Sequence, residues 1–130
     1  MSIQGDVQAA FQAAVTLFNN HNISIMQYID ADASVYSISG QLGYHPKHAV
    51  RAYFQEEFLD NPNFNPASLT PTVTLNLAKT GATISDTALW TDTHYSAGSP
   101  LKILYVFTFV LRPGNPSPTN AWLLSTMWGS

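Results

Sequence analysis

The sequence predicts an α+β domain in which helices pack on one face of a curved antiparallel sheet. The first sixty residues contain most of the helical apolar spacing, whereas from Leu69 onward the chain reads as segments of strand length separated by turn residues. Helices followed by consecutive strands are typical of an α+β architecture. The length of 130 residues suits a single domain, which we place at 1–130.

The first helix is predicted after Asp6, which can cap it. Its apolar residues recur at the spacing of one helical face, and the segment 19–22, rich in Asn, ends it. The residues of that face are Val7, Ala10, Phe11, Ala14, Val15 and Phe18.

The next part of the chain mixes helix and strand signals. A short helix over 24–29 precedes a strand over 32–39. Pro46 suits the first residue of another helix, which ends by Asp60. The segment 61–66 is rich in Pro and Asn and predicts a loop.

Four antiparallel strands are predicted next, over 72–79, 85–96, 101–112 and 121–128. The third is apolar on both faces, and a strand buried on both faces needs two covers. The helices supply one cover. For the other we predict a second copy of the chain, which would make the protein a homodimer.

Composition limits the partners and the location. The net charge is −3, and the five Lys and Arg residues form no cluster, so we expect neither nucleic acid nor a membrane surface as a partner. The absence of cysteine excludes disulfides and thiolate chemistry. The N-terminal segment lacks a basic region followed by an apolar run, so we expect a cytoplasmic protein.

Several local patterns follow one another in a specific order over nearly the whole chain. They are the first amphipathic helix followed by Asn20-His21, the segments 28–36 and 43–54, Asp86-Thr-Ala88 at a strand, the segment 107–112 and Trp122 near the start of the last strand. Together they resemble the nuclear-transport-factor-2-like superfamily, in particular its SnoaL-like polyketide cyclase and ketosteroid-isomerase-like branches.

This resemblance implies a cone-shaped α+β barrel with a deep interior pocket, often in a dimer formed across the outer sheet face. Many such relatives are enzymes on hydrophobic small molecules, whereas others only bind ligands or hold subunits together, so the fold does not settle the function. The chain also departs from one branch, because Thr126–Gly129 stands where that branch carries a histidine cluster, and an apolar residue near Val106 matches its usual arginine.

Asp92 and His94 are the first catalytic candidates. On a strand they share a face with Trp90, a face that the resemblance places toward the pocket. Inside an apolar cavity the pair could move protons near neutral pH. The alternative is that this end of the strand has left the barrel and both side chains are solvated.

Tyr36 is the third catalytic candidate, as a hydrogen-bond donor to a carbonyl that becomes an oxyanion. The alternative for Tyr36 is a core ring with its hydroxyl near a rim. Asp32 more simply turns the chain into its strand. Glu57 is a further pocket carboxylate candidate, although Glu56 and Glu57 suit a solvent-facing helix surface.

Aromatic and apolar residues are the candidates for binding a ligand, although such residues are also typical of a plain core or a dimer interface. We predict no metal site, because His45 and His48 are not spaced as two ligands on one helix face and no third ligand is evident. The ligand-binding candidates are Trp90, Phe107, Trp128, Phe54 and Val106.

The predicted function is that of a small cofactor-independent acid–base enzyme that isomerises, cyclises or dehydrates a hydrophobic carbonyl compound. The alternative is a ligand-binding or dimer-forming domain without chemistry. An open cavity reached by Asp92 and His94 would favour the enzyme, and a cavity filled by Trp90 and Trp128 would favour the alternative.

Overall fold

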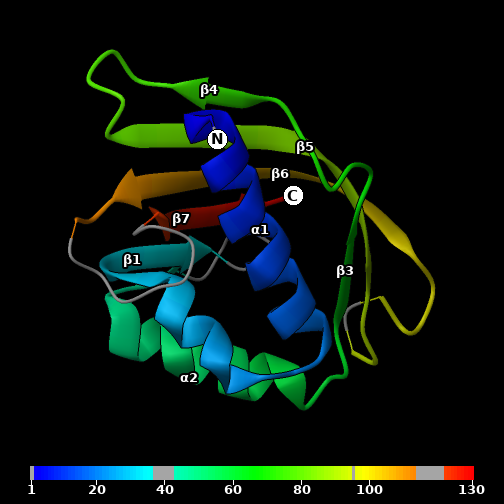
Figure 1. Cartoon of the computed structure of the whole chain (residues 1–130). Coiled ribbons are helices and arrows are strands. Elements are labelled where there is room, and N and C mark those ends of the chain that lie inside the picture. The colour runs from blue at the N-terminus through cyan, green and yellow to red at the C-terminus, as the bar shows by residue number, and fades with distance from the viewer. Residues whose placement is uncertain (1, 37–42, 95, 114–121) are drawn as a thin grey trace.

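The computed structural model describes residues 2–36, 43–94, 96–113 and 122–130. They form one curved sheet with the helices gathered on one side (Figure 1). α1 (Ile3–Asn19) lies across the sheet, η1 (Ile23–Tyr28) is a 3₁₀ helix, and α2 (Lys47–Phe58) contacts both η1 and the first strand. The predicted α+β class is confirmed.

The sheet is mixed and open, not antiparallel and closed. Its strands run in the order β2-β1-β7-β6-β5-β3, and β4 pairs with β5. β1 runs parallel to β7, whereas the other pairs are antiparallel. The prediction of an entirely antiparallel sheet was therefore wrong at this pair. The strands are β1 (Ile29–Tyr36), β2 (Gly43–Tyr44), β3 (Asn63–Pro66), β4 (Val73–Leu75), β5 (Gly81–Thr91), β6 (Leu101–Leu111) and β7 (Trp122–Gly129).

The first helix begins earlier than predicted. Ser2, and not Asp6, is its cap, because Ser2 Oγ accepts a 2.9 Å hydrogen bond from the backbone N–H of Gly5. The apolar face predicted for this helix is confirmed, since all six of its residues are buried. This face sets α1 against the sheet.

The segment predicted as a loop after α2 contains strand β3. The strand pairs with β5, and the side chain of Asn19 completes hydrogen bonds to both backbone groups of Phe64, at 2.8 Å each. Pro66 closes a strand on the edge of the sheet, where the missing N–H of proline is tolerated. The same residue that ends α1 thus fixes β3, whose Phe64 side chain enters the core.

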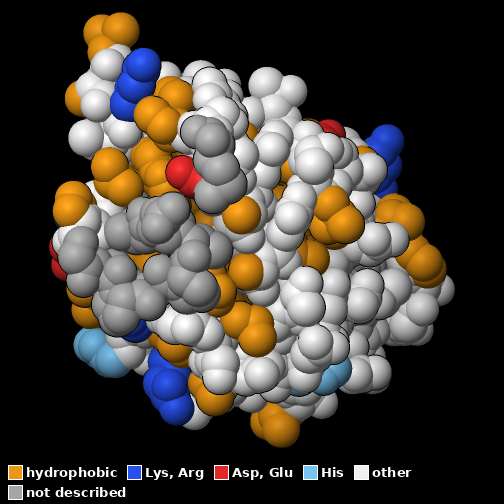
Figure 2. Space-filling model, viewed as in Figure 1, with side chains coloured by type: hydrophobic (Ala, Val, Ile, Leu, Met, Phe, Trp, Pro, Cys, Tyr) orange, Lys and Arg blue, Asp and Glu red, His pale blue; other side chains and the backbone are white. Residues whose placement is uncertain are grey.

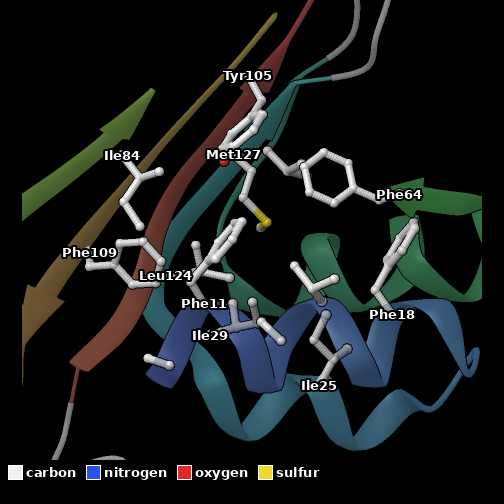
Figure 3. Packing of buried hydrophobic residues seen from close by; sticks show 14 of the residues in the cluster. Phe11, Phe18, Ile25, Ile29, Phe64, Ile84, Tyr105, Phe109, Leu124 and Met127 are labelled. Carbon is white, nitrogen blue, oxygen red and sulfur yellow. The ribbon is translucent and has the colours of Figure 1, made fainter. Parts of the chain in front are cut away.

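The core lies between α1 and the sheet. In Figure 3, Phe11 and Phe18 rise from α1 toward the side chains that the strands contribute, among them Phe64, Tyr105 and Met127. Figure 2 shows that charged side chains are sparse on the face that carries α1. Among the described helices none has the length and apolar character that a bilayer crossing needs.

Candidate active site

A cavity of about 80 Å³ lies within this core. Aromatic rings form much of its wall, and among the residues that the structure describes no charged side chain lines it. The rings also pack on one another, with Phe11 stacked on Tyr105 at 5.8 Å and Phe64 edge-on to Tyr105 at 5.2 Å. The lining includes Phe11, Phe18, Phe64, Trp90, Tyr105 and Phe107.

The cavity approaches solvent beside two of its lining residues. Tyr36 is 45% exposed and Trp128 is 39% exposed. Tyr53 and Phe54 of α2 form a further part of the wall. Three sequence-predicted ligand residues besides Trp128 therefore meet around one cavity, namely Trp90, Phe107 and Phe54.

Val106, the remaining predicted ligand residue, does not line the cavity. It lies between the core residues Tyr105 and Phe107 on β6, and successive side chains of a strand point to opposite faces. Its cross-strand partners are Ser85 and Trp128. Val106 therefore belongs to the outer face of the sheet.

Tyr105 is the most deeply buried tyrosine among the lining residues. Its side chain is 0% exposed, and within the described residues its hydroxyl is the one buried side-chain polar atom without a hydrogen-bond partner. Burial, with a smaller effect from Asp86, raises the pKa of this hydroxyl far above its ordinary value. The Tyr105 hydroxyl therefore stays protonated near neutral pH.

Asp92 lies just beyond the end of β5 and is buried. One carboxylate oxygen accepts the indole N–H of Trp90 at 2.8 Å, and the other accepts the backbone N–H groups of His94 at 3.0 Å and Ser96 at 2.8 Å. These donors compensate the loss of water around the carboxylate. They also turn the chain away from the sheet, so the predicted strand 85–96 ends at Thr91.

The side chains of Asp92 and His94 do not share an environment. Asp92 is buried, whereas His94 is exposed on the turn, because the strand geometry that would align them has already ended. Neither residue is part of the cavity lining, and Asp92 contacts the lining residue Trp90 through a hydrogen bond. The structure thus matches neither simple alternative, since the cavity is open but the pair does not line it.

Glu57, which the sequence analysis named as a further candidate after Asp92, is a carboxyl group beside the cavity wall. It lies on α2 four residues after the lining residue Tyr53, which places the two on the same side of the helix. Burial, followed by the nearby Asp92, raises the pKa of Glu57 to about 7. The pKa of the Tyr53 hydroxyl is also raised, by burial and then by Glu57.

A second buried carboxylate, Asp30, is used differently. Arg112 forms a two-point ion pair with it, Nε to Oδ1 at 2.7 Å and Nη2 to Oδ2 at 3.2 Å. The hydrogen bond from Arg112 lowers the pKa of Asp30. The pair joins β1 to the end of β6 and does not line the cavity.

Comparisons with known proteins place the fold. No protein-family model matches the chain, and no curated protein matches it in sequence. Among solved structures, a nuclear transport factor 2-like superfamily protein from Salmonella enterica matches with a TM-score of 0.75 at 8% identity, over 98% of this chain and 89% of that one.

Two enzyme-like structures match with similar coverage. The epoxide hydrolase/cyclase-like enzyme SalBIII, described for pyran ring formation in the polyether salinomycin, has a TM-score of 0.67 at 15% identity, over 99% of this chain and 92% of that one. A putative ketosteroid isomerase from Shewanella frigidimarina has a TM-score of 0.70 at 13% identity, over 99% of this chain and 95% of that one. The resemblance seen in the sequence is confirmed as a nuclear-transport-factor-2-like fold.

Proposed function

We propose that this protein, with its nuclear-transport-factor-2-like fold, is a small acid–base enzyme. It would isomerise, cyclise or dehydrate a hydrophobic carbonyl compound without a cofactor. One observation carries the proposal: Glu57, whose pKa is raised to about 7, lies one helical turn behind Tyr53, a residue of the aromatic cavity wall, and does not itself line the cavity. A carboxyl group of that pKa is matched to proton transfer near neutral pH.

The chemistry begins with removal of a proton from the carbon next to the carbonyl group. Glu57, which stands behind the lining residue Tyr53, takes this proton through one water molecule, and the electron pair moves onto the carbonyl oxygen, where a tyrosine hydroxyl donates a hydrogen bond to it. Return of the proton to another carbon completes an isomerisation. Attack of the carbanion on a second carbonyl carbon of the same molecule, whose oxygen receives the proton back from Glu57, gives a ring. Departure of a β-hydroxyl group as water, protonated by Glu57, gives a dehydration.

Asp92 acts as a positioning residue in this proposal. It holds the Trp90 ring in the wall and contributes to the raised pKa of Glu57. The proton-transfer roles that the sequence suggested for Asp92 and His94, and the oxyanion role suggested for Tyr36, stay predictions. The cyclase and isomerase descriptions of two similar structures support a reaction of this general type.

A second candidate function is ligand binding without chemistry. It is favoured by the hydrogen bonds of Asp92, whose three N–H donors give the buried carboxylate a sufficient structural reason. In that case the cavity would hold a hydrophobic molecule and the raised pKa of Glu57 would be a by-product of its burial.

Deuterium exchange separates the two candidates. Phenylacetone is incubated with the protein in D₂O, and loss of its α-proton signals is followed by NMR. We expect the wild type to accelerate exchange, with a rate that rises as pH passes through about 7. Replacing Glu57 by Gln should lower the rate by about 100-fold, while Glu56→Gln, on an exposed neighbour, leaves it unchanged.

One result of this experiment would exclude catalysis of the exchange. If the wild type exchanges phenylacetone no faster than Glu57→Gln, although both bind it, the binding-only candidate replaces the enzyme.

A further inference from the structure

We infer that the ligand of this cavity carries a quaternary ammonium group, which the aromatic wall holds under the negative potential of three carboxyl groups behind it. The inference rests on the proposed function only in taking the cavity as the ligand site. It adds the charge and the chemical class of the group that enters the cavity.

Two of the carboxyl groups stand behind the part of the wall that α2 and β5 form. Glu57 lies one helical turn from Tyr53, and Asp92 accepts the indole N–H of Trp90 at 2.8 Å. Both Tyr53 and Trp90 line the cavity. Burial and then the charge of Asp92 raise the pKa of Glu57, and every charged neighbour that contributes to this shift is a carboxylate. This side of the wall is therefore negative in potential.

Asp86 adds a third carboxyl group from the middle of β5. It stands directly opposite Tyr105 of β6, which places the two side chains on the same face of the sheet. All five Lys and Arg residues lie in the described part of the chain, and none of them lines the cavity. Arg112 is bound to Asp30 instead. The cavity therefore lies in a field that attracts a cation and repels an anion.

The aromatic wall favours one kind of cation. A cation is attracted to the faces of aromatic rings, most strongly to tryptophan and where water is excluded. Phe18 lies 5.7 Å from Trp90 and 5.9 Å from Phe54, so three rings of the lining meet at this part of the wall. A primary ammonium group would lose hydrogen bonds to water in such an apolar lining. A quaternary ammonium group has no N–H donors and avoids this loss.

The volume of the cavity limits how much of the ligand is enclosed. At about 80 Å³ it is well below the roughly 300 Å³ of sites that enclose drug-sized ligands. The cavity therefore encloses the ammonium head. The rest of the molecule extends toward solvent beside Tyr36 and Trp128, the two exposed residues of the lining.

The test compares choline with 3,3-dimethylbutan-1-ol, which has nearly the same shape but carries a carbon atom in place of the charged nitrogen. Affinities are measured by NMR titration at pH 8, where Glu57 is ionised. We expect the wild type to prefer choline about tenfold. The double variant Glu57→Gln/Asp86→Asn should prefer it less than about threefold, with its affinity for the alcohol retained. Glu56→Gln, which removes the same charge from an exposed neighbour, should behave as the wild type.

The N-methyl proton signal of bound choline is a second readout that needs no variant. Protons over aromatic ring faces resonate upfield, so this signal should move upfield and show nuclear Overhauser contacts to Trp90 and Phe54. Four results would each overturn the inference: equal affinities of the wild type for the two probes, a tenfold preference that persists in the double variant, contacts of choline with surface residues alone, or failure of both probes to bind.

Choline has no carbonyl group, so its binding is independent of the proposed reaction. If the wild type prefers choline but does not exchange phenylacetone, the enzyme proposal fails and the ammonium site stands. If phenylacetone is exchanged but choline is not preferred, the enzyme proposal stands and this inference fails.

Discussion

The indole N–H of Trp90 donates a hydrogen bond to the carboxylate of Asp92, which links the cavity wall to the turn that ends β5. The other carboxylate oxygen of Asp92 holds the backbone of that turn through His94 and Ser96. One side chain therefore sets both the orientation of a wall ring and the length of a strand.

Replacing Asp92 by Ala should lower the free energy of unfolding by about 2 kcal/mol, because three donors, one of them the indole N–H of buried Trp90, lose their acceptor. Urea denaturation measures the change. Thr93→Ala is the control, since its hydroxyl makes an exposed hydrogen bond to the Asp60 carbonyl and should change stability by less than about 0.5 kcal/mol. Equal effects of the two substitutions would contradict this role of Asp92.

The ion pair of Asp30 and Arg112 should make stability depend on acidic pH. Arg112 lowers the pKa of Asp30 below its ordinary value of 3.8, so the pair stabilises the fold above that pH and the stabilisation is lost as pH falls through the lowered pKa. Arg112→Met should therefore be less stable than the wild type at pH 7, and the difference should shrink below about pH 4.

Thermal unfolding across the pH range tests this difference. Lys102→Met removes an exposed positive charge from β6, the strand that Arg112 follows, and serves as the control. A deficit of Arg112→Met that is independent of pH would show that packing, not the ion pair, is responsible.

Glu57 should make stability fall as pH rises. Its pKa is raised from 4.5 to about 7, so between these values the folded state keeps a proton that the unfolded state releases. Glu57→Gln should match the wild type near pH 4 and exceed it at pH 8 by about 1 kcal/mol after solvent screening is allowed for. Urea denaturation at both pH values measures this, with Glu56→Gln as the control. If Glu57→Gln changed the free energy of unfolding at pH 8 no more than Glu56→Gln does, the result would be inconsistent with the raised pKa.

Tyr105→Phe should leave the ligand-free protein at least as stable as the wild type. The substitution removes a buried hydroxyl that has no partner within the described chain and keeps the ring contacts with Phe11 and Phe64. Chemical denaturation measures the change. A loss above about 1 kcal/mol would mean that the hydroxyl has a structural partner.

A second copy of the chain remains the cover we propose for the outer sheet face. Leu104, on that face, is 57% exposed, and Val106 and Val110 lie along the same side of β6. Sedimentation should show a dimer for the wild type and a monomer for Leu104→Glu. Leu77→Glu, in the fully exposed turn after β4, should remain dimeric. A wild type that is monomeric at high concentration would disprove the dimer.

The sequence predicted well what depends on local periodicity. The apolar face of α1 follows from a spacing of apolar residues that suits a helix, and β6 follows from an apolar run of strand length bounded by turn residues. The errors in the ends of two elements arose where a side chain accepts hydrogen bonds from the backbone. The Ser2 hydroxyl places the start of α1 before Asp6. The Asp92 carboxylate ends β5 at Thr91, and the strand also begins earlier than predicted, at Gly81. β3 was missed because its Pro and Asn residues are typical of a loop, and its pairing with β5 depends on distant residues.

The sequence predicted only the part of the candidate site that depends on local patterns. The aromatic wall was visible as rings on strand faces, and Glu57 could be named as a carboxylate on α2. Tyr105 was placed on the apolar face of its strand, yet a tyrosine among hydrophobic side chains was a signal of a buried polar group. Whether its hydroxyl finds a partner depends on the packing of α1 and β3 around it, which no local pattern contains.

The parallel contact between β1 and β7 determines the order in which the sheet can assemble. Ile29 pairs with Leu124, and the other neighbour of β1 is the two-residue strand β2. During synthesis, β1 therefore has no long strand beside it until the last strand leaves the ribosome. Such distant pairing costs chain entropy before its contacts are formed, so we expect the sheet to fold in one late step that needs both ends of the domain.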